Sequence, residues 1–177
     1  LRQAGQSEEA RTYYRRVLRT QRNHSVSLHH LGVIALQFGK SEDAVDYIRK
    51  AVRAQPVYPF AHNNLGNALR NVGRLEDAEA SYSTAISQKP DYAEAHYNWA
   101  IIKEDRADPE AAMAGYKHAI ELKPDYTDAH VKIGVLQIAQ NKYEEALACD
   151  SPKNKVRQSK VKINKDNFDF EKYKSKN

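Results

Sequence analysis

Apolar residues recur along this chain at helical spacing, in segments separated by short polar turns. In one segment Leu65, Ala68 and Leu69 fall three and four residues apart, which is the spacing of the buried stripe of an amphipathic helix. Charged and polar residues occupy the positions between them. The pattern therefore predicts an all-α fold.

The helical pattern returns at a fixed interval. When the sequence is written in rows of 34 residues that begin at Ser25, Pro59, Ala93 and Thr127, the same residue types share a column. A fixed period of this length is the signature of a repeat array in which each row is one supersecondary unit. Column 7 is large and apolar, column 8 is small, and column 20 is alanine: Leu31, Leu65, Trp99 and Ile133; Gly32, Gly66, Ala100 and Gly134; Ala44, Ala78, Ala112 and Ala146.

Each row predicts two antiparallel helices, a first helix over about columns 1 to 14 and a second over about columns 18 to 30. Small residues such as Gly66, Ala78 and Ala85 let the two backbones approach closely. Large residues such as Tyr82 and Ile86 fill the space between rows.

Turn and cap residues follow the same period. Gly39, Gly73 and Asn141 fall in column 15, where a left-handed residue ends the first helix. Ala107 breaks this rule, so its turn is predicted to be costlier or differently shaped. A glutamate in column 18 is expected in the first turn of the second helix, prolines in column 32 end it, and aspartates then cap the next row: Glu8, Glu42, Glu76, Glu110 and Glu144; Pro56, Pro90 and Pro124; Asp91 and Asp125.

The pattern Leu65, Gly66, Leu69, Gly73, Ala78, Tyr82, Ala85 and Pro90 resembles the tetratricopeptide repeat. This resemblance implies a right-handed superhelical solenoid of antiparallel helix pairs over about residues 1–149. It divides the chain into a partial repeat 1–24, full repeats 25–58, 59–92 and 93–126, and a truncated repeat 127–149. A pentatricopeptide RNA-binding array is the alternative, but its period is slightly longer and it lacks these small residues and prolines.

The repeat pattern breaks after Ala146. Asp150, Lys153 and Gln158 stand where the frame requires an aromatic residue, a small residue and a proline, so the second helix of this row is predicted to be aborted. Residues 150–177 form a basic tail that we expect to be disordered. Alternatively, Phe168, Phe170 and Tyr173 fold back over the open end of the solenoid.

Charge is uneven along the chain. Nine of the Lys and Arg residues and three of the acidic residues lie within 151–177, which gives this segment +6, whereas the whole chain carries +5. The repeats are therefore near neutral, and nucleic acid is not an expected partner except through phosphate contacts of the tail. No apolar run reaches the roughly 20 residues of a membrane span. The single cysteine, Cys149, favours a reducing compartment, and we expect a cytoplasmic protein.

Catalytic chemistry is not indicated. We find no phosphate loop, no metal-ligand spacing and no nucleophile beside a base, so we expect no enzyme activity, no cofactor, no metal and no small-molecule substrate. His62, His96 and His130 recur in column 4, but this places them on successive helices, where we expect them to pack rather than to bind a metal. His29 and His30 are adjacent in the sequence and are predicted to face different ways.

The resemblance implies that the first helices line a concave surface that binds partners. Asn64 and Asn98 share column 6 there and are similar to the asparagine ladder in the repeat domain of O-linked N-acetylglucosamine transferases; His30 and Lys132 limit it to two rungs. An amide suits the backbone of an extended peptide, although ordinary solvated asparagines are the alternative. The candidate partner-binding residues are Asn63, Asn64, Asn67, Arg70, Asn71, Tyr97, Asn98 and Lys132.

A second comparison is the carboxylate clamp with which some tetratricopeptide domains hold the acidic end of heat-shock chaperones. Asn67, Asn98 and Lys132 fit its columns, but Asn63 and Asp128 replace lysines, and Asp128 would repel a carboxylate. We therefore expect a protein-interaction scaffold that binds an extended segment of a protein or peptide partner. The alternative is the substrate-recognition arm of a larger enzyme, such as a glycosyltransferase or a sulfotransferase.

Overall fold

The computed structural model describes residues 2–150, and its side chains over residues 7–142. Within this range the chain is helical and contains no strand. The chain divides into two units between Gly134 and Val135, and α8 begins in the first of them. The helices are α1 (Arg2–Thr20), α2 (Ser25–Gln37), α3 (Ser41–Ala54), α4 (Pro59–Asn71), α5 (Leu75–Gln88), α6 (Ala93–Asp105), α7 (Pro109–Leu122) and α8 (Thr127–Asp150).

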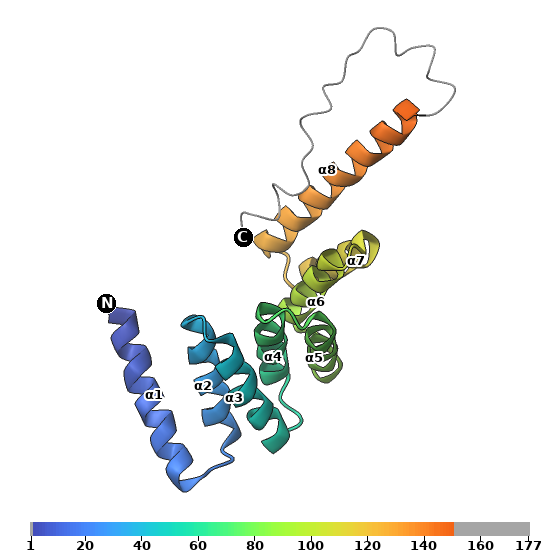
Figure 1. Ribbon diagram of the computed structural model, residues 1–177. Helices are drawn as coiled ribbons and strands as arrows, with labels where there is room; N and C mark the ends of the chain where they lie inside the picture. Colours follow the sequence, from blue (N-terminus) through green and yellow to red (C-terminus); the bar gives the residue numbers. More distant parts are fainter. Residues whose placement is uncertain (1, 151–177) are drawn as a thin grey trace. The chain divides into compact units, whose positions relative to one another are not determined.

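The first unit is a series of helix pairs (Figure 1). Helix α2 packs with α3, α4 with α5, and α6 with α7, while α3 against α4 and α5 against α6 join successive pairs. Each pair occupies one 34-residue row, with its first helix in the early columns of the row. The predicted all-α solenoid of paired helices is thereby confirmed. None of the described helices is long and apolar enough to cross a membrane.

Small residues face large ones inside two of the pairs, so the expectation that Tyr82 fills the space between rows is wrong. A β-carbon added to Gly66 would lie 2.5 Å from the ring of Tyr82, and one added to Gly32 would lie 2.3 Å from Ile48. Tyr82 and Ile48 are fully buried. The glycines are therefore required by the close approach of two helices.

The turns inside the helix pairs share one backbone conformation. Gly39 and Gly73 have φ angles of 69° and 77°, and Ala107 has a φ of 58°. The turn at Ala107 is thus not differently shaped, because alanine adopts the same left-handed conformation. It does so at a cost of about 1–2 kcal/mol that glycine avoids.

The expected turn at Asn141 is wrong, because α8 runs through this residue to Asp150. Asparagine makes a weaker stop than glycine, and the residues after Ala146 lack the aromatic and small positions with which a second helix would pack. Continuing the helix keeps its backbone hydrogen bonds. Glu144 therefore lies within α8 and not in a first turn. Glu8 also lies within a helix, because α1 runs unbroken from Arg2 to Thr20. The expected glutamates at Glu42, Glu76 and Glu110 do occupy first turns.

The expected aspartate cap of α6 is also wrong. Tyr92 holds the N-cap position without a side-chain hydrogen bond, and Asp91 instead lies 3.4 Å from the ammonium group of Lys89. Tyr58 holds the corresponding position before α4. Residues 151–177, for which we expected a disordered tail, lie outside the described residues.

Candidate functional site

The predicted binding residues lie on α4 and α6, the first helices of two pairs, except Lys132, which lies on α8. Helix α2 is the corresponding first helix of the preceding pair. Columns 5 and 6 of the rows form one continuous side of these helices, which we call the first-helix face: His29, His30, Asn63, Asn64, Tyr97 and Asn98.

Hydrogen bonds join each first helix to the next across this face. The amide nitrogen of Asn64 lies 2.9 Å from Nε2 of His29, and the amide nitrogen of Asn98 donates to Oδ1 of Asn63 over 3.0 Å. In both cases a column 6 residue reaches back to column 5 of the preceding row. The two asparagines of the predicted ladder are therefore part of the connection between helix pairs.

Tyrosines before the first helices extend these connections. The hydroxyl of Tyr58 lies 3.0 Å from Nδ1 of His29, and the amide of Asn63 donates to the hydroxyl of Tyr92 over 3.4 Å. The third tyrosine, Tyr126, packs on Tyr97 with ring centroids 4.9 Å apart. These tyrosines were not among the predicted site residues, although a tyrosine recurs at this position every 34 residues, a signal that could have identified them.

Burial fixes the protonation of His29. Desolvation, helped by the neighbouring His30, lowers the pKa of His29 from 6.5 to about 4, so the ring is neutral at physiological pH. A neutral imidazole has one donor and one acceptor nitrogen. Because Asn64 donates to Nε2, the proton sits on Nδ1 and is donated to the oxygen of Tyr58. The next row has the same direction of hydrogen bonding: the column 6 asparagine donates to the column 5 residue, and the column 5 residue donates to the tyrosine hydroxyl.

Asn63 is the one buried residue among the eight candidate binding residues, with 2% of its surface exposed, so it supports the fold and does not contact a ligand. Three others are partly exposed but already have side-chain partners: Asn67 accepts from the hydroxyl of Tyr82 at 2.7 Å, Arg70 pairs with Asp105, and Lys132 pairs with Glu104. The remaining four are also at least partly exposed: Asn64, Asn71, Tyr97 and Asn98.

The column 4 histidines have a structural role. Nε2 of His62, His96 and His130 each donates to the carbonyl oxygen of the proline six residues earlier over 2.9 Å. Each contact ties a first helix to the end of the preceding second helix. Among the described residues no three His, Cys, Asp or Glu side chains are grouped so that they could hold a metal ion.

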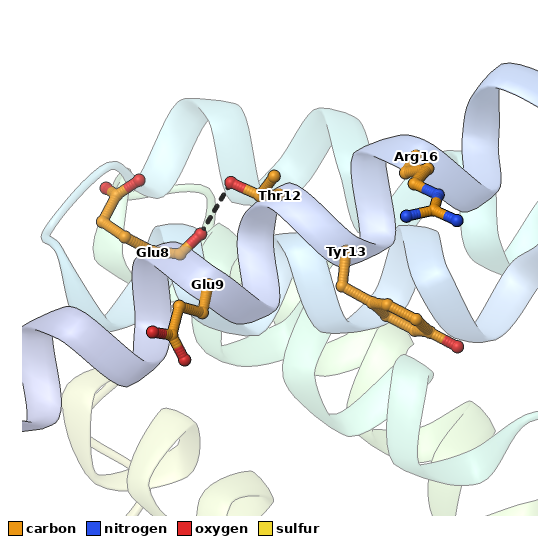
Figure 2. A pocket seen from close by; sticks show the side chains of 5 residues that line it. All are labelled: Glu8, Glu9, Thr12, Tyr13 and Arg16. Atoms are coloured by element: carbon orange, nitrogen blue, oxygen red, sulfur yellow. Dashed lines mark hydrogen bonds between the residues drawn. The ribbon is translucent and has the colours of Figure 1, made fainter.

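A shallow hollow lies on the surface of α1. Its lining side chains, Glu8, Glu9, Thr12, Tyr13 and Arg16, all belong to this one helix, as Figure 2 shows. A ligand site needs polar groups that converge from several elements. The hollow is therefore the outer surface of a single helix and not a candidate site.

Two family models match the sequence, one described as a TPR repeat over residues 66–103 and one as a tetratricopeptide repeat over residues 1–59. No curated protein matches it.

Solved structures share the fold. MamA is 24% identical, with a TM-score of 0.73 over 83% of this chain and 86% of the other. The first TPR domain of Spaghetti (RPAP3), bound to an HSP90 peptide, is 21% identical, with a TM-score of 0.64 over 66% and 93%. YrrB, described as a TPR protein with an unusual peptide-binding site, is 25% identical, with a TM-score of 0.65 over 73% and 67%. With its 34-residue helix pairs and these matches, the chain is a tetratricopeptide-repeat protein.

Proposed function

We propose that this chain is a protein-interaction scaffold whose first-helix face binds an extended segment of a partner protein. Two relatives by fold support a polypeptide ligand, since one was solved with an HSP90 peptide and the other is described by its peptide-binding site. The alternative of a recognition arm within a larger enzyme stays a prediction.

The observation that carries the proposal is the pair of partly exposed asparagines. Asn64 and Asn98 each use one amide N–H in a contact between helix pairs. Each amide still has an oxygen acceptor and a second N–H. Their inward contacts hold both side chains in fixed positions, which lowers the entropy lost when a ligand binds.

The spacing of these amides suits an extended chain. Packed helices lie about 8–10 Å apart, and an extended polypeptide advances about 3.3 Å per residue. The two amides therefore match backbone groups about three residues apart. Contacts to backbone groups supply affinity for an extended segment whatever its side chains are.

Asn71 and Tyr97 provide the sharper test, because neither the side-chain amide of Asn71 nor the hydroxyl of Tyr97 forms a hydrogen bond within the described part of the chain. We would select peptides on the full chain from a displayed random library and measure their affinity by fluorescence anisotropy. The test variant is N71A/Y97F. The matched control is N23A/Y47F, which removes the same groups from a turn and from α3.

We expect each lost hydrogen bond to weaken binding by about 0.5–1.5 kcal/mol, so that N71A/Y97F binds about ten times more weakly than the parent chain. The control should bind like the parent. If the control loses affinity and N71A/Y97F does not, peptides bind elsewhere on the chain and the proposal is wrong.

A further inference from the structure

The two cations among the candidate binding residues, Arg70 and Lys132, are already neutralised. Nε of Arg70 lies 3.3 Å from a carboxylate oxygen of Asp105. Nζ of Lys132 lies 3.1 Å and 3.2 Å from the two oxygens of Glu104, which also accepts a hydrogen bond from the hydroxyl of Tyr116 at 2.6 Å. Neither cation is available to pair with an acidic ligand without the loss of an existing contact.

Two carboxylates, on α6 and at the start of α8, are not neutralised by a cation. Glu94 and Asp128 are exposed, and neither forms an ion pair among the described residues. Glu94 accepts only a long hydrogen bond, 3.3 Å, from the hydroxyl of Tyr92. Both residues stand in column 2, on α6 and at the start of α8.

Glu94 stands three residues before Tyr97 on α6, about one helical turn away, and Asp128 stands two residues after Tyr126. Burial raises the pKa of the Tyr126 hydroxyl, and the negative charges of Glu94 and Asp128 also raise it. Tyr126 packs on Tyr97, a residue of the first-helix face. The carboxylates therefore flank an aromatic pair on this face.

Two cations lie nearby, and both already have a partner. The ammonium group of Lys89 lies 3.4 Å from a carboxylate oxygen of Asp91. The ammonium group of Lys123, in the turn before α8, lies 5.0 Å from the centre of the Tyr126 ring, an arrangement in which the ring itself attracts the cation. Because Asp91 cancels the charge of Lys89, two unpaired carboxylates stand against one remaining positive charge, and the local balance is negative.

The exposed arginines of α1, Arg15, Arg16 and Arg19, do not offset this balance. Helices α2 and α4 separate α1 from α6 in the series of pairs, and each packing step adds about 8–10 Å. Screening at physiological salt is effective beyond about 8 Å. The charge that a ligand meets at α6 is therefore set by the residues around it.

We infer that the part of the first-helix face beside Glu94 and Asp128 binds a stretch of the partner segment that carries Lys or Arg. The inference rests on the proposed function and names the charge of its ligand. A basic side chain would meet two free carboxylates beside an aromatic pair, whereas an acidic one would meet repulsion. The predicted partner is a protein with an extended basic stretch.

The test is the composition of peptides that the full chain selects from a displayed random library. We expect Lys and Arg to be enriched on the parent chain and this enrichment to disappear on E94Q/D128N. A selected basic peptide should bind E94Q/D128N about five times more weakly at low salt. The matched control is D43N/D46N, which removes two exposed carboxylates from α3 and should behave like the parent.

Two results would overturn the inference: selection of neutral or acidic peptides, or equal affinity of a basic peptide for the parent and for E94Q/D128N. If such peptides still depend on Asn71 and Tyr97, only the charge of the ligand is wrong and the proposed function stands. If no selected peptide depends on Asn71 and Tyr97, both proposals fail.

Discussion

The side-chain amide of Asn98 on α6 donates to the side-chain oxygen of Asn63 on α4 over 3.0 Å. The two residues are 35 positions apart, and Asn63 is buried. One side of Asn98 therefore holds two helix pairs together while the other remains partly exposed. The same residue can support the fold and contact a ligand.

This double role predicts that Asn98→Ala destabilises the protein. The oxygen of Asn63 would lose its donor in a buried place, which costs about 1–3 kcal/mol. Urea denaturation should show the loss as a lower midpoint with an unchanged slope. Asn71→Ala is the control and should unfold like the parent. An unchanged midpoint for Asn98→Ala would mean that the contact contributes nothing to stability.

Two glycine substitutions are predicted to have opposite effects on stability, because Gly66 lies at the contact between α4 and α5 and Gly134 lies at an open position on α8. Gly66→Ala places a methyl group against the ring of Tyr82 and should cost about 1–3 kcal/mol by overpacking. Gly134→Ala meets no atom within 4 Å and should gain about 0.5–1 kcal/mol from its position in a helix. Thermal unfolding of both variants checks this. Equal effects at the two sites would contradict the assigned interface.

The left-handed turn at Ala107 predicts a stabilising substitution. Ala107→Gly should raise the free energy of unfolding, because it relieves a backbone cost of about 1–2 kcal/mol that the greater freedom of glycine in the unfolded chain partly offsets. Gly73→Ala is the reverse change in the equivalent turn and should destabilise. Chemical denaturation gives both values, and a destabilised Ala107→Gly would refute the left-handed assignment.

The sequence predicted the fold more completely than it predicted the site. Gly39 and Gly73 predicted their turns because few residues adopt a left-handed backbone without cost. The turn predicted at Asn141 was wrong. A turn between two helices also requires that the second helix packs on the first, and this depends on tertiary contacts. Asn63 and Asn64 are neighbours of the same type, so the sequence could not show that the first is buried and the second is not. The tyrosines before the first helices have partners one row away, and periodicity alone does not reveal a partner.

The buried neutral His29 predicts a pH dependence of stability. Its pKa is about 4 in the folded chain and 6.5 in the unfolded reference, so between these values the unfolded chain binds more protons. Stability from this residue is complete above about pH 6.5 and falls as the pH drops towards 4, by at most about 1.4 kcal/mol per pH unit.

His29→Gln is the variant that isolates this effect, because glutamine keeps hydrogen-bonding groups but does not titrate. The difference in unfolding free energy between parent and variant should shrink as the pH falls through this window. His96, whose pKa is also lowered, mainly by burial, remains in both proteins and cancels. A difference that stays constant from pH 7 to pH 4 would exclude a buried neutral His29.

The central proposal, binding of an extended segment on the first-helix face, is tested most directly by nuclear magnetic resonance during titration with a selected peptide. The side-chain amide signals of Asn64 and Asn98 report on the groups proposed to contact the ligand. We predict that these signals and the backbone amides of α4 and α6 shift together as the peptide binds. Shifts confined to α3, α5 and α7, with the signals of Asn64 and Asn98 unchanged at saturation, would contradict the proposal.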